Sequence, residues 1–135
     1  MIDTLEPVTL VSTTADCPAE AVLAPLLAAS AARHRHCCPR QVLGVRMALR
    51  GLQELGFVDE NYGPRFFNDK KQLLTIVETD GCGADGIAVT ADCHIGRRTL
   101  RVEDYGKVTA TFVDRASGRA IRVAPLPDVR ERVRA

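Results

Sequence analysis

The segment His34-Arg-His-Cys-Cys-Pro-Arg-Gln-Val-Leu-Gly-Val-Arg-Met-Ala-Leu-Arg-Gly-Leu-Gln-Glu-Leu55 carries the clearest structural signal in this chain of 135 residues. Pro39 is favourable at the first position of a helix, and Gly56 is a residue type at which helices end. Between them, apolar side chains recur at helical spacing and form one stripe: Val42, Val45, Leu49 and Leu52, broadened by Leu43, Met47 and Ala48. The pattern predicts an amphipathic helix from Cys38-Pro39 to Leu55-Gly56, in which Gly44 marks close packing against a neighbour.

Helical signals also occur on either side of this segment. Asp16 can cap a helix and Glu20 suits the positive end of the helix dipole, so we expect a first helix over the Ala/Leu-rich run that follows. Pro25 should shift the start of that helix or kink it. Farther along the chain, residues 84–90 favour a short helix after the Asp80-Gly-Cys-Gly turn.

Several segments favour β-strands. Leu73–Val77 is short and apolar, which predicts a strand buried on both faces. Residues 107–113 and 119–123 alternate apolar and polar side chains around Ser117-Gly118, which predicts an antiparallel hairpin. The stretch Val8–Val11 fits either a strand or a flexible lead-in.

Composition predicts a single domain over residues 1–135. Residues 1–15 are a lead-in and residues 125–135 a tail, and the sequence is compatible with flexibility in both. The chain has 46% hydrophobic residues, and 18 Lys+Arg against 17 Asp+Glu leave a net charge of +1. This charge argues against electrostatic capture of nucleic acid or of an anionic membrane, and aromatic residues at 4% are few for base stacking. No stretch approaches the roughly 20 apolar residues of a membrane span, and we find no secretory signal. We therefore expect a cytoplasmic protein that binds neither nucleic acid nor membrane.

Cysteine is the most informative residue type in the sequence. The chain has five cysteines, an odd number that cannot pair completely: Cys17, Cys37, Cys38, Cys82 and Cys93. Without an export signal, reduced thiols or metal ligands are expected rather than a framework of disulfides.

Two groups of thiol, imidazole and carboxylate side chains stand far apart in the sequence. The first is His34-Arg-His-Cys-Cys38, where the amino end of the main predicted helix favours a Cys38 thiolate. The second holds Cys82 and Asp85, with Cys93 11 residues beyond Cys82. A helix of about three turns between Cys82 and Cys93 would be roughly 16 Å long and would keep them apart unless the chain folds back. Spacing alone leaves two alternatives open: a metal site, or thiols that are small buried hydrophobic side chains.

Five motifs follow one another along the chain: His34-x-His36-x-Cys38-Pro39, Leu43-Gly44-x-Arg46, Val77-Glu78-x-x-x-Cys82-x-x-Asp85, Cys93-x-x-Gly96 and Asp104-Tyr-Gly106-Lys107. In this order they resemble the FmdE family, which takes its name from a component of formylmethanofuran dehydrogenase, over most of the chain. The resemblance implies an α+β fold in which helices pack on a mainly antiparallel sheet, and it implies a homodimer. It covers the core domain of the family, without the C-terminal zinc finger that some members carry.

The resemblance also implies a cleft that holds a transition metal where the two groups meet. Carried over by position, the implied metal ligands are His36, Cys38, Cys82 and Cys93. The candidate cofactor-binding residues are His34, Arg46 and Asp85, and the candidate catalytic residues are Cys38, Glu78 and Lys107. Soft thiolates with imidazole favour zinc, and an iron–sulfur cluster or a haem is the alternative.

The chain departs from the family pattern at several positions. Arg35, Arg40 and Asp92 stand where the family usually has glycine, His94 stands where threonine is common, and Cys37 is an extra thiol. Arg35 and Arg40 would narrow the cleft or hold an anionic ligand. His94 and Cys37 are additional candidate ligands.

Three functions are compatible with these residues. The first is a metal-binding protein that serves as an accessory or redox component in one-carbon or molybdenum/tungsten enzyme systems, within a larger redox enzyme complex. The second is a thiol-based enzyme in which Cys38 is a nucleophile or redox cysteine and His36 is its base. The third is a protein that binds haem or another tetrapyrrole. The resemblance favours the first.

Overall fold

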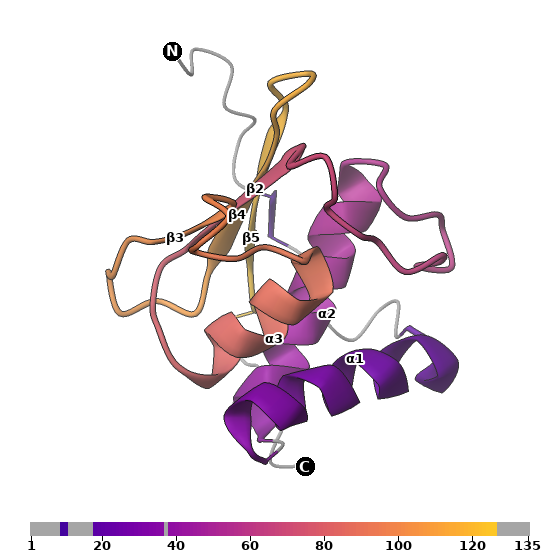
Figure 1. Ribbon diagram of the computed structural model, residues 1–135, viewed down its shortest axis with the longest axis vertical. Helices are drawn as coiled ribbons and strands as arrows, with labels where there is room; N and C mark the ends of the chain where they lie inside the picture. Colours follow the sequence, from indigo (N-terminus) through magenta and orange to yellow (C-terminus); the bar gives the residue numbers. More distant parts are fainter. Residues whose placement is uncertain (1–8, 11–17, 37, 127–135) are drawn as a thin grey trace.

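The computed structural model describes residues 9–10, 18–36 and 38–126, and Figure 1 shows their arrangement. In chain order the elements are β1 (Thr9–Leu10), α1 (Glu20–His34), α2 (Pro39–Glu54), β2 (Leu73–Val77), α3 (Cys82–Ala91), β3 (Leu100–Val102), β4 (Ala110–Asp114) and β5 (Ala120–Ala124). The helices lie on one side of the sheet, and α1 packs on α2 and α3 at the greatest distance from the strands.

The sheet has the strand order β1-β5-β4-β2-β3. Its centre is antiparallel, because β4 pairs with β2 in the register of Phe112 with Thr75 and with β5 in the register of Phe112 with Ile121. The edge strands β1 and β3 run parallel to β5 and β2. The predicted α+β fold, with helices on a mainly antiparallel sheet, is therefore confirmed, and the parallel edges are its unpredicted part.

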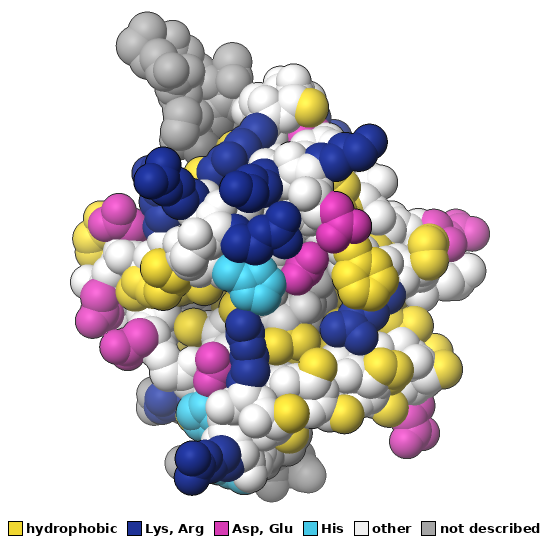
Figure 2. Space-filling view, in the orientation of Figure 1, with side chains coloured by type: hydrophobic (Ala, Val, Ile, Leu, Met, Phe, Trp, Pro, Cys, Tyr) yellow, Lys and Arg dark blue, Asp and Glu magenta, His cyan; other side chains and the backbone are white. Residues whose placement is uncertain are grey.

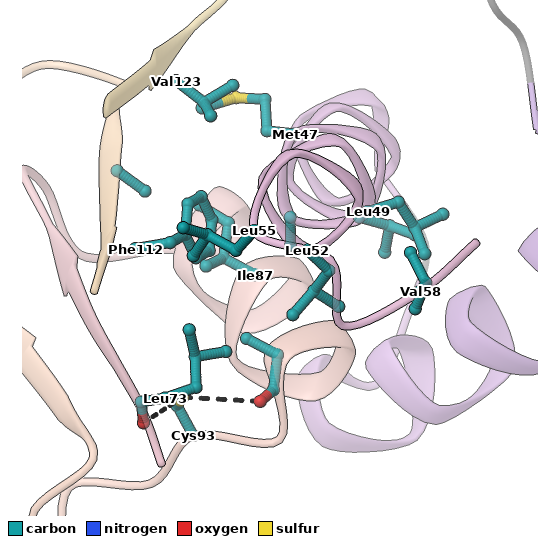
Figure 3. Packing of buried hydrophobic residues seen from close by; sticks show 14 of the residues in the cluster. Met47, Leu49, Leu52, Leu55, Val58, Leu73, Ile87, Cys93, Phe112 and Val123 are labelled. Carbon is teal, nitrogen blue, oxygen red and sulfur yellow. Dashed lines mark hydrogen bonds between the residues drawn. The ribbon is translucent and has the colours of Figure 1, made fainter. Parts of the chain in front are cut away.

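The helix predicted between Pro39 and Leu55 is confirmed as α2, and its apolar stripe forms the centre of the core. Figure 3 shows α2 directing Met47 toward Val123 of β5, while Phe112 of β4 is directed toward the helices. All three side chains are fully buried. Burial of this stripe fixes the rotation of α2 about its axis and so the direction of its first turn.

Glycines bring α2 and α3 together backbone to backbone. A Cβ atom on Gly44 would collide with the carbonyl oxygen of Gly83, and one on Gly86 would collide with that of Gln41. The close packing expected at Gly44 is thus confirmed. Gly83, in the first turn of α3, also faces the carbonyl of Arg40 in the first turn of α2. The amino ends of the two helices therefore lie together.

The prediction that β2 is buried on both faces is wrong. Leu73, Thr75 and Val77 are buried, whereas Leu74 and Ile76 on the other face are half-buried. The reason is that the helices cover only one face of the sheet.

Other elements differ from prediction mainly at their ends. The predicted helix over 84–90 extends from 82 to 91, and the hairpin is confirmed with β4 beginning at 110 rather than 107. Helix α1 begins at Glu20 and continues through Pro25, while Asp16, its expected cap, lies outside the described residues. Strand β3 was not predicted. None of the described helices has the length and apolar character that crossing a membrane requires.

Candidate metal centre

Three helix ends meet at the candidate centre. His34 is the last residue of α1, Cys38 is the N-cap of α2, and Cys82 is the first residue of α3. Arg35 adopts a left-handed conformation, with φ of 70°, which ends α1 and turns the chain toward α2. The packing of α2 on α3 then brings the Cys82 thiol to the segment that contains His34 and Cys38.

Four potential metal donors converge at this junction. One ligand atom from each of His34, His36 and Cys38 lies within 4.8 Å of the other two. The Cys82 sulfur is 3.0 Å from Nε2 of His34. The imidazole rings of His34 and His36 have centroids 4.9 Å apart. The two groups that the sequence keeps apart therefore form one cluster, composed of His34, His36, Cys38 and Cys82, which we call the His/Cys cluster.

Asp85 orients the first histidine. Its Oδ2 is 2.7 Å from Nδ1 of His34, and because a carboxylate only accepts, Nδ1 is the donor. In the neutral ring, Nε2 then carries the lone pair, and this atom faces the Cys82 sulfur. A carboxylate that holds one ring nitrogen while the other faces a metal is the usual arrangement of metal-binding histidines.

The pKa values of the Cys38 and Cys82 thiols are shifted in opposite directions. Burial alone would raise the pKa of Cys38. Hydrogen bonds to its sulfur, from the backbone N–H groups of Gln41 and Arg40 and from the Cys82 thiol, lower the pKa below its ordinary value, and the positive charge of Arg40 lowers it further. The hydrogen bond to Cys38 is also the main cause that raises the pKa of Cys82. Cys38 is therefore the better thiolate of the two.

Gln41 positions Cys38 and was not predicted as a site residue. Its Oε1 accepts a hydrogen bond of 2.7 Å from the Cys38 N–H, and its Nε2 donates to the hydroxyl and carbonyl of Ser30 in α1. The side chain is fully buried. The signal for it was present in the sequence, because a glutamine three residues after an N-cap is the pattern of a capping box.

Cys93 does not join the His/Cys cluster, so its predicted place among the ligands does not fit the structure. It follows the carboxyl end of α3, a ten-residue helix about 15 Å long, whereas Cys82 begins that helix. Cys93 is fully buried, and its sulfur contacts the Thr75 hydroxyl at 3.3 Å. It also contacts the Leu73 carbonyl at 3.7 Å (Figure 3). Burial raises the pKa of this thiol, which therefore has the surroundings of a core residue.

The predicted residues Glu78 and Lys107 lie together, but no described contact joins them to the His/Cys cluster. Glu78 forms a bidentate ion pair with Arg122, at 2.7 and 2.8 Å, and its carbonyl accepts from the Lys107 N–H at 3.2 Å. The hydrogen bond from Arg122 is the main cause that lowers the pKa of Glu78, and the Lys107 charge adds to it. Arg46 is half-buried on α2, and its Nε is buried without a partner among the described residues.

The chain's departures from the family pattern fall in two places. Arg35 and Arg40 are exposed beside the His/Cys cluster. Asp92 and His94 instead lie beyond the other end of α3. There His94 Nε2 is 2.9 Å from Asp92 Oδ1, and the guanidinium Nη2 of Arg33 donates to His94 Nδ1 at 3.1 Å. Figure 2 shows histidine side chains at two separate places on the visible face, each beside Lys or Arg. His94 is therefore not an added ligand of the cluster, and Cys37 lies outside the described residues.

Comparison with protein families matches residues 33–135 to the family described as "FmdE, Molybdenum formylmethanofuran dehydrogenase operon". A curated relative from Archaeoglobus fulgidus, named "Probable S-adenosyl-L-methionine-binding protein", is 37% identical over 90 residues, which are 67% of this chain. The chain spans 24% of the length of that relative. The crystal structure of an FmdE-like protein of the tungsten formylmethanofuran dehydrogenase type, from Syntrophus aciditrophicus, aligns with a TM-score of 0.48 and 21% identity. That alignment covers 68% of this chain and 44% of the other.

Proposed function

The chain belongs to the FmdE family. We propose that it binds a transition-metal ion, zinc in preference, through the group of His34, His36 and Cys38, with Cys82 beside His34 as the fourth ligand. The observation that carries the proposal is the hydrogen bond between His34 and Asp85, which leaves Nε2 of His34 facing the Cys82 sulfur. In this ligand set His34 replaces Cys93, which the family resemblance implies as the fourth ligand.

The donors of the His/Cys cluster suit zinc in type and number. Structural zinc sites take four cysteine or histidine ligands in a tetrahedron, whereas catalytic sites take three and keep one position open. His36 is the exposed histidine, so it is the donor whose release would open a position. Bound zinc supplies a Lewis acid that polarises a carbonyl or lowers the pKa of a water. The amino ends of α2 and α3 favour the negative charge that thiolates bring to the site.

For the wider role, we propose an accessory or redox component in one-carbon or molybdenum/tungsten enzyme systems. The family description supports this assignment, because it names a molybdenum formylmethanofuran dehydrogenase operon. The same proposal includes a homodimer, a larger redox enzyme complex as partner and a cytoplasmic location. The curated relative is about four times longer than the matched region, so its own activity is not part of the proposal.

Elemental analysis of protein purified anaerobically and without a histidine tag tests metal binding. We expect about one equivalent of a transition metal per chain, and colourless protein if the metal is zinc. Visible absorption would instead identify an iron–sulfur cluster or a haem. His94→Ala is the matched control, since its ring lies outside the His/Cys cluster and the metal content should stay the same. Less than about a tenth of an equivalent of any transition metal in the wild-type protein contradicts the proposal.

A thiol-based reaction at Cys38 is the second candidate, and the lowered pKa of that thiol favours it. A ring nitrogen of His36 lies within 4.8 Å of the Cys38 sulfur, a separation that one bridging water spans, and in this way His36 would serve as its base. Alkylation of metal-free protein, followed by peptide mapping, separates this candidate from the first. Preferential labelling of Cys38, lost in His36→Ala without loss of folding, supports it, and equal labelling of Cys38 and Cys82 argues against it.

A further inference from the structure

Cys38 and Cys82 face each other from the starts of two helices whose backbones are in contact. Both cysteines are free and half-buried, Cys38 as the N-cap of α2 and Cys82 as the first residue of α3. The Cys82 sulfur lies 3.0 Å from His34 Nε2, and His34 in turn is within the 4.8 Å group that contains Cys38. The close packing of Gly44 on Gly83 holds the starts of the two helices together.

We propose that Cys38 and Cys82 are a reversible disulfide pair, so that the His/Cys cluster alternates between a dithiol and an oxidised form that lacks both sulfur ligands. The exclusion of metal by the oxidised form rests on the proposed function, whereas the disulfide itself rests only on the placement of the two thiols.

The local backbone lets the sulfur atoms of Cys38 and Cys82 move into bonding contact. Cys38 is an N-cap with extended φ and ψ of −123° and 163°, and Cys82 follows Gly81, which has φ of 98°. Cys38 precedes α2 and Cys82 follows a non-helical glycine, so a small backbone change at Cys38 or Gly81 moves a sulfur atom without disturbing the packed helices. A disulfide needs such adjustment, because its S–S length and dihedral angle are narrowly defined.

The oxidant that the pair requires is a small-molecule disulfide of the glutathione type. A thiolate of the pair attacks one sulfur of that disulfide, which forms a mixed disulfide and releases one small thiolate. The second protein thiol loses its proton to the released thiolate, attacks the protein sulfur of the mixed disulfide and releases the second small thiolate, which takes a proton from solvent. Two electrons pass from the protein pair to the external disulfide, and excess small thiol reverses both steps.

Cys93 is the internal comparison. Its thiol is fully buried and hydrogen-bonded to core groups, so external disulfides reach it only when the protein opens. The expected reaction is therefore selective for the pair.

The test equilibrates metal-free protein with defined mixtures of reduced and oxidised glutathione, followed by acid quenching, alkylation and peptide mapping. We expect an intramolecular Cys38–Cys82 link that excess dithiothreitol reverses. Cys38→Ser and Cys82→Ser should not form it, and Cys37→Ser should form it as the wild type does. A link through Cys37, a link between chains, or a glutathione adduct that persists without closing would overturn the proposal. Since the wild-type map gives the answer, the proposal stays testable even if a serine variant fails to fold.

A second arm separates this inference from metal binding. With zinc at about 100 times its dissociation constant, oxidation should slow about a hundredfold, because only the metal-free fraction reacts. A Cys38–Cys82 link that zinc does not slow would support the disulfide and contradict the proposed function. Zinc binding without any link in the metal-free protein would overturn the disulfide and leave the proposed function standing.

Discussion

His34 and Asp85 lie 51 positions apart in the chain and are joined by a hydrogen bond of 2.7 Å between Nδ1 and Oδ2. The bond connects the last residue of α1 to the first turn of α3. It turns Nε2 toward the Cys82 sulfur, so one carboxylate determines which nitrogen of the ring is available to a metal.

Asp85→Asn should weaken zinc binding by about 10–100-fold, the usual effect of removing the carboxylate behind a metal-binding histidine. The amide can still accept a hydrogen bond but lacks the charge that makes the ring a stronger ligand. Competition with a chelator of known affinity measures the change. Asp59→Asn is the matched control, since Asp59 caps a loop beyond the carboxyl end of α2. Equal affinities of Asp85→Asn and wild type would count against the orienting role.

The two cysteines at opposite ends of α3 should differ in what their loss changes. Cys82→Ser should weaken metal binding, so that less metal stays with the protein through purification, with little effect on folding. Cys93→Ser should keep the metal stoichiometry and lower the free energy of unfolding by about 1–2 kcal/mol, because a buried, hydrogen-bonded thiol is replaced by a smaller, more polar group. Urea denaturation and elemental analysis measure both effects. Loss of metal from a folded Cys93→Ser protein would restore Cys93 as a ligand.

Sequence patterns predicted the elements whose signals are local. Pro39 and the stripe through Leu49 define α2, and alternation defines the β4–β5 hairpin. Strand β3 has three residues, too few for an alternating pattern to be recognised. The parallel edges and the bidentate pair of Glu78 with Arg122, 44 positions apart, depend on contacts between distant segments that no local pattern encodes.

The candidate site was predicted in part for the same reason. The motifs predict His36, Cys38 and Cys82 as ligands. The structure places His36 and Cys38 in one group with His34, and His34 contacts Cys82. Helix geometry already argued that Cys82 and Cys93 lie at opposite ends of a helix, and α3 has that geometry. The sequence predicts His34 as a cofactor-binding residue rather than a metal ligand. Which ring nitrogen of His34 is available to a metal depends on its hydrogen bond to Asp85 in a different helix, and no local pattern encodes that contact.

Gly44→Ala should reduce stability and disturb the site together. The new methyl group would collide with the Gly83 carbonyl and push α2 away from α3, at a cost of about 1–3 kcal/mol in the free energy of unfolding. Because Cys38 and Cys82 begin these helices, zinc affinity should fall as well. Gly96→Ala is the control, since its Cβ would enter open space. A Gly44→Ala protein as stable as Gly96→Ala would contradict the backbone contact between α2 and α3.

Acid should weaken the wild-type fold partly through Glu78. The pKa of this carboxyl lies below its ordinary value of 4.5 in the folded state, chiefly because Arg122 donates hydrogen bonds to it. Its contribution is therefore fully present above pH 4.5 and is lost as the pH falls through the lowered value. Glu78→Gln should be about 2 kcal/mol less stable at neutral pH and should lose less stability on acidification, as urea denaturation at each pH would measure. Asp92 and Asp114, whose pKa values are also lowered, leave a residual slope in both proteins. Parallel stability curves for the two proteins would argue against this role of Glu78.

X-ray absorption at the zinc edge of zinc-loaded, tag-free protein is the most direct test of the proposed metal centre. A centre built from His34, His36, Cys38 and Cys82 predicts two sulfur neighbours at about 2.3 Å and two nitrogen neighbours at about 2.0–2.1 Å. Cys82→Ser should lower the sulfur count by one, and Cys93→Ser should leave it unchanged. A shell of oxygen and nitrogen alone, or a sulfur count that falls in Cys93→Ser and not in Cys82→Ser, would contradict the assigned centre.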